Sequence, residues 1–242
     1  MGEVIVGDRK RLVVLLPTKN EEEGVGEVID RIPRNEIENL GYNLEILVID
    51  GDSDDSTCRV AKDKLAKVIN QKTPMGKGSG FKQALTHVLD GQHQKEDILI
   101  MLDADATYHS EDIPRFIKEL REYEVVWGSR LRGVIEPGAM SRINKLGNIL
   151  LSLTASLVNF RRTTDLCTGY WGFRLSALYG FSLSADGFSL EAELFGAVCK
   201  GGYSSKEIVI DYDHREGQSN LKWYKDGPKI FFKILSKRLS WE

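Results

Sequence analysis

Short apolar runs that alternate with helical segments are the feature that most constrains the fold of this chain. The segments between the runs carry helical patterning over about 10 to 15 residues each. Because consecutive parallel strands need a helical crossover, this alternation predicts an α/β fold with a doubly wound, mainly parallel sheet flanked by helices. The runs that we expect as strands are Leu12–Leu16, Leu44–Asp50, Val68–Ile69, Ile98–Leu102 and Val125–Ser129.

The segments between these strands supply the predicted helices. Asn20 stands three residues before Glu23, as in a capping box, so we expect a helix over Glu21–Arg31. Further helices are expected from the turn at 52–57 to about Ala66, over Ser79–Leu89, and from Ser110 to about Tyr123.

The alternation fades after Arg130, and the second half is expected to be organised differently. A Gly/Pro loop comes first, and a basic helix ends the chain. The elements expected between them are a long helix near Ser141–Asn159, a loop through Asp165–Phe173, a helix near Ser189–Cys199 and a strand at Glu207–Asp213.

Composition limits the partners and the compartment. The 242 residues suffice for one large α/β domain, and a net charge of −3 gives no reason to expect a nucleic-acid partner. The three cysteines lie far apart, which predicts neither disulfides nor a zinc site. Met1–Arg11 lacks the pattern of a signal peptide, and the uncharged run Leu146–Phe160 is too short and too polar for a membrane span. We therefore expect a cytoplasmic protein.

Two carboxylates follow the apolar run Ile98–Leu102, in the sequence Asp103-Ala104-Asp105. In an open α/β sheet, ligands bind beyond the carboxyl ends of the strands. Two hard oxygen donors at this place suit a divalent ion that is also held by substrate phosphates. The alternative for an isolated Asp-x-Asp is a strand end that caps the next helix.

Two other strand ends deliver polar residues to the same edge. They are the segment from Pro17 to Glu21 and the triplet Asp50-Gly51-Asp52. A carboxylate at a strand end can accept hydrogen bonds from a ribose or a base edge. Asn20 and Asp52 could instead cap helices, but three such ends on one edge favour a binding site.

The segment Gly76–Gly80 opens a predicted helix and contains Lys77. Backbone N–H groups and the lysine charge could bind a phosphate there. The spacing fits neither a Walker A loop nor G-x-G-x-x-G, so a flexible turn is the alternative.

The order of these motifs resembles a known family. The chain reads V-V-x-L-P-T-x-N-E-E, V-I-D-x-x-S-x-D-x-T, M-G-K-G, D-A-D and G-S-R from Val13 to Arg130. This order is similar to that of the family 2 inverting glycosyltransferases, and most similar to the dolichyl-phosphate mannose synthase group, over about Leu12 to Lys222. The resemblance implies a GT-A fold, which is a Rossmann-like, mainly parallel sheet with acceptor-side helices toward the C-terminus.

The resemblance also implies roles on the donor side. Asp103 and Asp105 would hold Mg²⁺ or Mn²⁺ against the diphosphate of a nucleotide sugar. The other positions that would surround the donor are Pro17, Thr18, Lys19, Glu21, Asp50, Asp52, Lys77, Ala104, Arg215 and Lys222.

Roles on the acceptor side follow from three further matches. The helix that begins near Met140 resembles one that contacts a lipid phosphate, Thr164–Tyr170 resembles D-x-x-S/T-G-F/Y, and Arg215–Lys222 resembles R-x-G-x-S-x-x-K. Arg130, Arg142 and Ser219 are the implied acceptor-phosphate ligands. The implied catalytic residues are Asp105, Arg130 and Asp165. If the acceptor were a hydroxyl, Asp165 or Glu191 would have to take its proton.

The chain departs from the family pattern at three places. Lys19 occupies a position that is often aromatic, and Asp50-Gly51-Asp52 replaces the commoner D-D-G. These two departures leave the base of the donor open between guanine and uracil. Thr107 stands where a glutamine often assists the metal, so the resemblance does not identify a third protein ligand of the ion.

The terminal helix, expected over Gly227–Glu242, is basic and amphipathic. An apolar stripe of Phe231, Ile234, Leu235 and Leu239 lies among lysines that recur every four residues. Such a helix can lie in an anionic membrane interface, and the alternative is a helix docked on the domain.

Together these patterns predict one GT-A domain over residues 1–242. It would comprise a nucleotide-sugar half (11–130), an acceptor half (131–222) and the terminal helix (223–242). We expect it to move a hexose from GDP-mannose to dolichyl or polyprenyl phosphate at the cytoplasmic face of a membrane. The alternatives are a UDP-sugar donor or a small soluble acceptor. A nucleotidyltransferase is disfavoured because no Gly-rich loop follows the first strand, and the non-enzyme alternative is a phosphate-binding scaffold.

Overall fold

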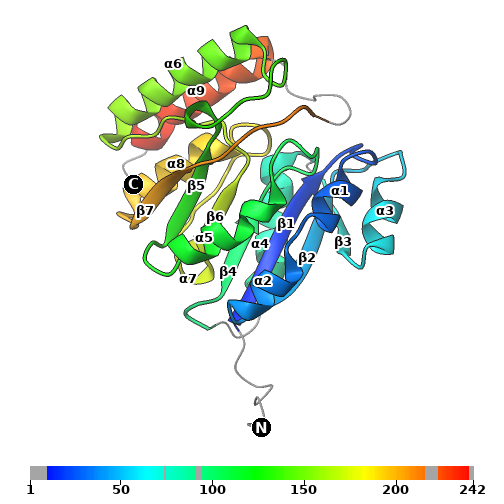
Figure 1. Cartoon of the computed structure of the whole chain (residues 1–242). Coiled ribbons are helices and arrows are strands. Elements are labelled where there is room, and N and C mark those ends of the chain that lie inside the picture. Colours follow the sequence, from blue (N-terminus) through cyan, green and yellow to red (C-terminus); the bar gives the residue numbers. More distant parts are fainter. Residues whose placement is uncertain (1–9, 74, 91–93, 216–222, 240–242) are drawn as a thin grey trace.

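The computed structural model describes residues 10–73, 75–90, 94–215 and 223–239, and within them one seven-stranded sheet (Figure 1). The strand order is β3-β2-β1-β4-β6-β5-β7, and every pairing is parallel except the two that involve β6. The predicted mainly parallel α/β sheet is confirmed. The strands are β1 Lys10–Thr18, β2 Tyr42–Asp50, β3 Lys67–Asn70, β4 Ile98–Met101, β5 Val125–Ser129, β6 Trp171–Arg174 and β7 Ser205–Val209.

The interior strand β1 is buried on both faces, which explains its apolar run from Leu12 to Leu16. Successive side chains of a strand point to opposite faces of the sheet. Leu12, Val14 and Leu16 accordingly enter one core, and Val13 and Leu15 enter the other.

Helices cover both faces of the sheet (Figure 1). Side chains of α1, α2, α3 and α5 pack into one core, and side chains of α4, α6, α7, α8 and α9 pack into the other. The helices are α1 Val25–Asp30, α2 Arg34–Asn39, α3 Thr57–Asp63, α4 Lys77–Val88, α5 Ile113–Glu119, α6 Arg142–Asn159, α7 Leu175–Leu178, α8 Leu190–Lys200 and α9 Trp223–Leu239. Short 3₁₀ turns occupy Ser110–Asp112 and Arg130–Arg132.

The prediction of a loop through Asp165–Phe173 is confirmed as far as Tyr170 and is wrong beyond it, because the chain enters β6 at Trp171. Trp171–Arg174 runs antiparallel between β4 and β5. Gly172 at its centre lowers the strand propensity of so short a run. A Cβ at this position would lie 3.1 Å from Leu120 Cδ1 and 3.2 Å from Phe116 Cδ1, so the glycine allows α5 to pack closely over the strand.

The capping box expected at Asn20 does not form. Asn20 adopts a positive φ of 56°, and its side chain donates to Asp54 Oδ1 at 2.7 Å. The helix begins later, at Val25, after Gly24. A Cβ on Gly24 would lie 2.7 Å from the carbonyl oxygen of Ala104, so this turn passes directly against the segment after β4. The expected strand at Glu207–Asp213 also shifts, since β7 ends at Val209.

Helices α6 and α9 lie side by side over one end of the sheet (Figure 1). Ile230 and Ile234 of α9 are buried, so one part of its expected apolar stripe faces the domain. The side chain of Leu239 is outside the described residues. Among the helices of the described part of the chain, none is both long enough and apolar enough to cross a bilayer.

Candidate active site

Three parallel strands bring the acidic residues to one edge of the sheet. Thr18, the last residue of β1, is in register with Asp50, the last residue of β2. On the other side, Leu15 of β1 pairs with Met101 of β4, so Asp103 and Asp105 leave the sheet at the same edge. The strand ends therefore meet where the sequence predicts.

Asp50 is 2% exposed and is held by residues of its own edge. Its Oδ1 accepts from Thr18 Oγ1 at 3.2 Å and from Ser53 Oγ at 2.6 Å. Lys19 lies across the same turn, with its Nζ donating to the carbonyl oxygen of Gly51 at 3.0 Å. Asp52 is exposed and has a positive φ of 66°. The predicted donor residues Thr18, Lys19, Asp50 and Asp52 therefore lie together at the adjacent ends of β1 and β2.

Arg215 connects Asp105 to Glu21 across the edge. Its Nε donates to Asp105 Oδ2 at 2.6 Å, its Nη2 also pairs with that oxygen, and Nη2 lies 3.5 Å from Glu21 Oε1. Burial raises the pKa of Glu21 to about 8, because the opposing attraction of Arg215 is weaker. Thr107 Oγ1 donates to Asp105 Oδ1 at 2.6 Å and fixes the other side of this carboxylate.

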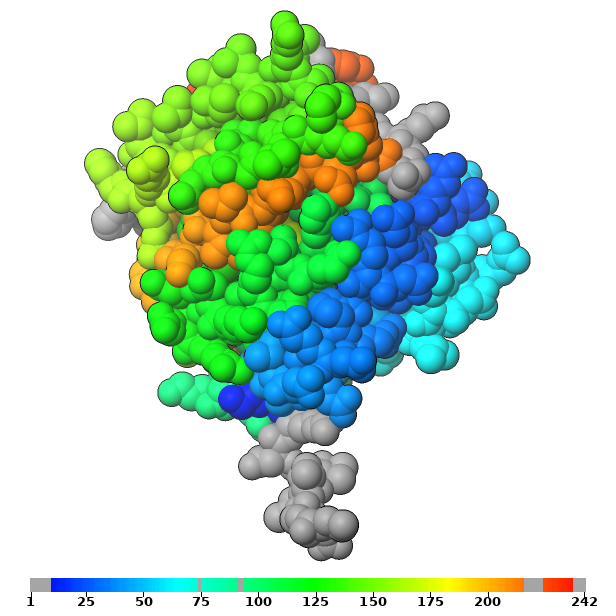
Figure 2. Space-filling model, viewed as in Figure 1, coloured from blue at the N-terminus to red at the C-terminus, as the bar shows by residue number. Residues whose placement is uncertain are grey.

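The chain reaches Arg215 by crossing the molecule after β7. In Figure 2 this segment, coloured orange, runs across the visible face toward the N-terminal helices, coloured blue. Ser219 and Lys222, two of the predicted ligands, lie outside the described residues.

Lys77 forms a second cation bridge, between Asp103 and Glu191. Its Nζ lies 2.5 Å from Asp103 Oδ1 and 2.7 Å from Glu191 Oε1. Burial favours the uncharged lysine, but the two carboxylates outweigh it and raise the pKa of Lys77. The pKa of Asp103 is lowered, since Lys77 outweighs the effect of burial, whereas burial raises the pKa of Glu191.

The glycines beside Lys77 serve close packing. A Cβ on Gly76 would lie 2.3 Å from the carbonyl oxygen of Asp186, and one on Gly78 would lie 2.4 Å from that of Ala185. Gly76 also has a positive φ of 134°. The M-G-K-G motif therefore fixes the start of α4 against the segment before α8, which brings Lys77 to the carboxylates.

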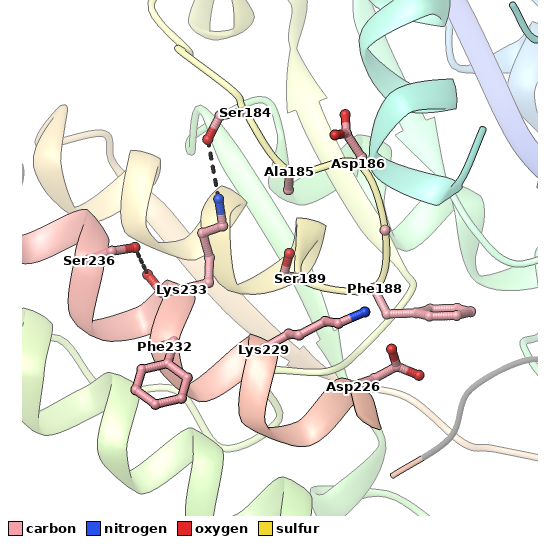
Figure 3. Close-up of a pocket in the computed structure, with 11 residues that line it drawn as sticks. Ser184, Ala185, Asp186, Phe188, Ser189, Asp226, Lys229, Phe232, Lys233 and Ser236 are labelled. Atoms are coloured by element: carbon pink, nitrogen blue, oxygen red, sulfur yellow. Dashed lines mark hydrogen bonds between the residues drawn. The ribbon is translucent and has the colours of Figure 1, made fainter. Parts of the chain in front are cut away.

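A pocket of about 570 Å³ lies on the other side of that same segment (Figure 3). Residues 184–189 form one wall and α9 forms the other, with Lys229 and Lys233 on the α9 side. Its lining contains none of the acidic residues from the strand ends. Because Ala185 and Asp186 contribute to the pocket and also pack on α4, the pocket and Lys77 share a wall.

The residues at the strand ends fit a divalent cation. Asp103 and Asp105 are hard oxygen donors, and Glu21 Oε2 is buried with no hydrogen-bond partner among the described residues. No group of three or more candidate ligands occurs in the described part of the chain. Mg²⁺ and Mn²⁺ ions that bind nucleotides take one or two carboxylates and complete their shell with phosphate oxygens and water, so two carboxylates suffice.

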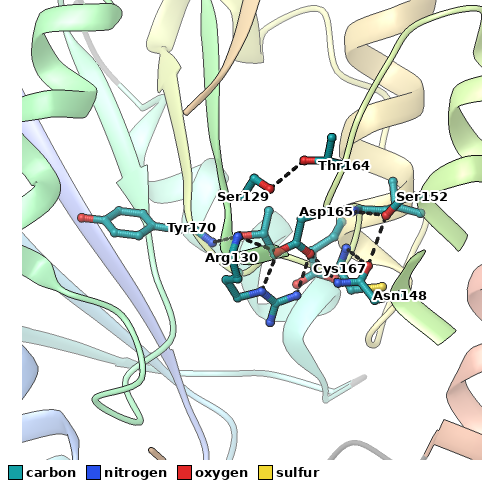
Figure 4. A network of polar contacts seen from close by, with 12 residues as sticks. Ser129, Arg130, Asn148, Ser152, Thr164, Asp165, Cys167 and Tyr170 are labelled. Carbon is teal, nitrogen blue, oxygen red and sulfur yellow. Dashed lines mark hydrogen bonds and ion pairs between the residues drawn. The ribbon is translucent and has the colours of Figure 1, made fainter. Parts of the chain in front are cut away.

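Arg130 and Asp165 form a buried pair at the end of β5 (Figure 4). Arg130 donates from its backbone N and Nε to Asp165 Oδ2, at 2.9 and 2.7 Å, and from Nη2 to Oδ1 at 2.7 Å. Asn148 Nδ2 donates to Oδ1 at 2.5 Å. Arg130 outweighs the effect of burial and lowers the pKa of Asp165, so this carboxylate stays ionised.

Aromatic rings border the other side of Arg130. Its guanidinium carbon lies 5.0 Å from the ring centroid of Tyr212 and 5.9 Å from that of Tyr108. Arg142 is exposed at the start of α6. The candidate acceptor residues thus comprise a rigid buried arginine and a second arginine on the surface.

Sequence reasoning missed Asn148 and Glu207. Asn148 is a buried polar residue of α6, and its place in the sequence next to Ile149 and Leu150 is a signal that could have drawn attention to it. Glu207 accepts from Thr164 N at 2.7 Å and from Trp127 Nε1 at 3.0 Å, which holds the loop that carries Asp165.

The geometry agrees with the result of a family search. The profile described as glycosyl transferase family 2 matches residues 13–180, more than half of the chain. The chain belongs to glycosyl transferase family 2. The strand-end acids and M-G-K-G fall within the matched region, whereas Arg215 lies beyond it.

Relatives within family 2 include two proteins named for lipid-phosphate acceptors. A dolichyl-phosphate hexose transferase from Haloferax volcanii is 30% identical over 220 residues, which are 90% of this chain and 90% of that protein. A dolichol-phosphate mannosyltransferase from Pyrococcus furiosus is 30% identical and matches 96% of this chain but only 64% of its own length. These relatives support the predicted position of the chain among hexosyltransferases of the family.

A solved structure shares the fold. Glucosyl-3-phosphoglycerate synthase from Mycobacterium tuberculosis, in complex with Mn²⁺, UDP-glucose and phosphoglyceric acid, superposes with a TM-score of 0.70. The identity is 19%, over 95% of this chain and 80% of that one. At this identity the likeness shows the fold alone, and it confirms the GT-A-like architecture.

Proposed function

We propose that this chain is an inverting hexosyltransferase that moves mannose from GDP-mannose to dolichyl or another polyprenyl phosphate. It would work peripherally, at the cytoplasmic face of a membrane. The observation that carries the proposal is the placement of Arg130, buried and fixed by Asp165, beside the sheet edge that holds the Asp103/Asp105 pair. The names of the Haloferax and Pyrococcus relatives support the lipid-phosphate acceptor and, for the second, the mannosyl donor.

On the donor side, Asp103 and Asp105 would hold Mg²⁺ or Mn²⁺. A bound ion supplies positive charge that stabilises a departing diphosphate. Arg215 lies at the same carboxylate and would add fixed charge toward the phosphates. Thr18, Lys19, Glu21, Asp50, Asp52 and the backbone at Pro17 and Ala104 would surround the nucleoside and its diphosphate.

On the acceptor side, a phosphate monoester arrives already ionised and needs no strong general base. Arg130 and Arg142 would orient it by charge-assisted hydrogen bonds. Within the described part of the chain, the Asp165 carboxylate accepts hydrogen bonds from Arg130 and from Asn148 of the adjoining helix, and its side chain is fully buried. Its proposed role is therefore to position Arg130, and this favours a phosphate acceptor over a hydroxyl acceptor.

The alternative is a small soluble acceptor with a UDP-sugar donor. The named ligands of the mycobacterial structure, UDP-glucose and phosphoglyceric acid, are of this kind. Glu191 would then be the candidate to accept the hydroxyl proton, because burial raises its pKa.

A transfer assay with radiolabelled sugar nucleotides distinguishes these functions. GDP-mannose, UDP-glucose and UDP-N-acetylglucosamine are each incubated with the protein, Mn²⁺ and dolichyl phosphate or 3-phosphoglycerate. We expect label in the organic phase with GDP-mannose and dolichyl phosphate. Label only in the water-soluble fraction, or lipid product from none of the donors, would overturn the acceptor assignment.

A further inference from the structure

The outer face of α6 carries an exposed apolar stripe that the domain leaves uncovered. Its members recur at spacings of three and four residues, so they share one side of the helix. Leu150 and Leu153 are each 56% exposed. The stripe consists of Ile143, Leu146, Ile149, Leu150, Leu153, Leu157 and, just after the helix, Phe160.

The opposite face of α6 accounts for its attachment to the domain. Asn148, Ser152 and Ala155 are buried there. Ser152 Oγ accepts from the backbone N of Leu166 at 2.8 Å, and Asn148 binds Asp165. This inner face fixes the rotation of the helix, so the stripe is held outward by the fold itself.

We propose that this stripe, the apolar outer face of α6, is the surface through which the chain binds an anionic lipid bilayer. This assignment rests on the proposed function, because a protein that transfers sugar to a lipid phosphate has to work next to a membrane. It places the contact on α6, whereas the sequence predicts it on the terminal helix.

The charge around the stripe complements anionic lipid. Arg142 and Lys145 stand at the N-terminal end of α6, the exposed Arg162 follows its C-terminal end, and no acidic residue occurs within the helix. An interfacial helix combines such a basic rim with a large apolar face, and the negative surface potential of a membrane attracts each cation near it.

The neighbouring helix extends the same surface. In α9, which packs beside α6, Phe232 is 67% exposed, and Phe231 and Lys229 are also exposed. Phe232 also lines the pocket of Figure 3, where it belongs to the wall formed by α9. Aromatic and basic side chains together are typical of the boundary between headgroups and acyl chains.

A second copy of the chain fits this face less well. Around a two-fold axis, an antiparallel pairing of α6 helices sets Arg142 and Lys145 near Arg162 of the other copy. A parallel pairing sets each basic cluster against itself. Both arrangements bring like charges together at the ends of the contact, which disfavours association.

Co-sedimentation with vesicles tests the proposal without donor or acceptor. The full chain is mixed with vesicles of phosphatidylcholine alone or of an equimolar mixture with phosphatidylglycerol. We expect sedimentation with the anionic vesicles. The double variant Leu150→Glu/Leu153→Glu should bind at least about tenfold more weakly, since it removes two leucines that would insert into the bilayer and adds two negative charges.

The matched control is Leu65→Glu. Leu65 is 88% exposed, next to the end of α3 and on neither α6 nor α9, and its replacement should leave vesicle binding unchanged. Circular dichroism melting establishes that both variants fold. Wild-type protein that stays in the supernatant, or a double variant that binds as well as wild type, would overturn the proposal. So would a dimer in analytical ultracentrifugation that the double variant dissociates.

The two proposals fail in distinguishable ways. Vesicle binding without sugar transfer from any donor would leave this surface assignment standing and overturn the proposed function. Transfer to detergent-dispersed dolichyl phosphate by a protein that does not bind vesicles would support the proposed function and overturn the assignment of the α6 surface.

Discussion

Asn148 of α6 donates its side-chain amide to Asp165, 2.5 Å away, and Asp165 in turn binds the guanidinium of Arg130 (Figure 4). The helix whose outer face is apolar therefore holds, with its inner face, the arginine proposed to bind the acceptor phosphate. A displacement of α6 would act directly on this pair.

Replacement of Asn148 tests this link. In Asn148→Ala, Asp165 loses a donor, and the backbone N of Cys167 loses its acceptor. We expect a loss of about 1–3 kcal/mol in the free energy of unfolding, measured with urea. If Asn148 positions Arg130, kcat should also fall while the affinity for the sugar nucleotide is unchanged. The control is Asn144→Ala, an exposed position on the same helix; equal behaviour of the two variants would contradict the link.

Replacement of Asp165 separates positioning from proton transfer. Asp165→Asn leaves Arg130 buried without a counter-charge, which should cost about 3–5 kcal/mol in urea unfolding. A base that merely accepts a proton would instead lose activity with unchanged stability. Activity loss with an unchanged urea midpoint would therefore refute the positioning role.

The same pair predicts an acid-sensitive component of stability. The pKa of Asp165 is lower in the folded protein than its usual value. Its contribution to the free energy of unfolding is therefore complete at neutral pH. It is lost as the pH falls from about 4, the unfolded value, through the folded pKa. Urea unfolding below pH 5 should show a steeper loss in the wild type than in Asp165→Asn, and parallel curves would contradict this.

Gly169 allows Asp103 its position. A Cβ at residue 169 would lie 2.2 Å from Asp103 Oδ2, so Gly169→Ala should displace the carboxylate. We expect Mn²⁺-dependent nucleotide binding, measured by calorimetry, to weaken by about 1–3 kcal/mol. In the control Gly147→Ala, the added Cβ meets nothing within 4 Å, and the replacement should stabilise α6 by about 0.5–1 kcal/mol. Unaltered binding in Gly169→Ala would show that Asp103 is not needed in its observed place.

Lys77 offsets the repulsion between Asp103 and Glu191. Lys77→Met keeps a similar volume but leaves both carboxylates without their shared cation. We expect a loss of about 3–5 kcal/mol in thermal or urea unfolding. The control Lys82→Met, on the same helix, removes a partly exposed pair with Asp186 and should change stability by less than about 1 kcal/mol. Similar losses in both variants would argue against the bridge.

The sequence predicted the fold best at the interior strands, where the residues of one strand are enough to indicate that it is buried. The interior strands β1, β2 and β4 are continuous apolar runs because both of their faces are buried, and their acidic ends were predicted at the correct edge. The strand β6 escaped prediction because Gly172 interrupts its pattern and its partners are distant in sequence.

The contacts within the site could not be predicted, since they depend on tertiary packing. Arg215 and Asp105 are 110 positions apart, and Arg130 and Asp165 are 35 apart. The resemblance to family 2 suggested roles for these residues but not their pairing. Likewise, the orientation of α6 follows from the burial of Asn148 and Ser152, which no helical pattern alone reveals.

Metal-dependent transfer by wild type and Asp105→Ala tests the central claim most directly. Asp105 is 2% exposed at the sheet edge beside Arg215 and is proposed to hold the ion against the diphosphate. With labelled GDP-mannose and dolichyl phosphate, the wild type should form lipid-linked mannose with Mn²⁺ and none with EDTA. Asp105→Ala should form none under either condition while keeping the wild-type circular dichroism spectrum. Product that forms in EDTA, or from a folded Asp105→Ala protein at the wild-type rate, would contradict the claim.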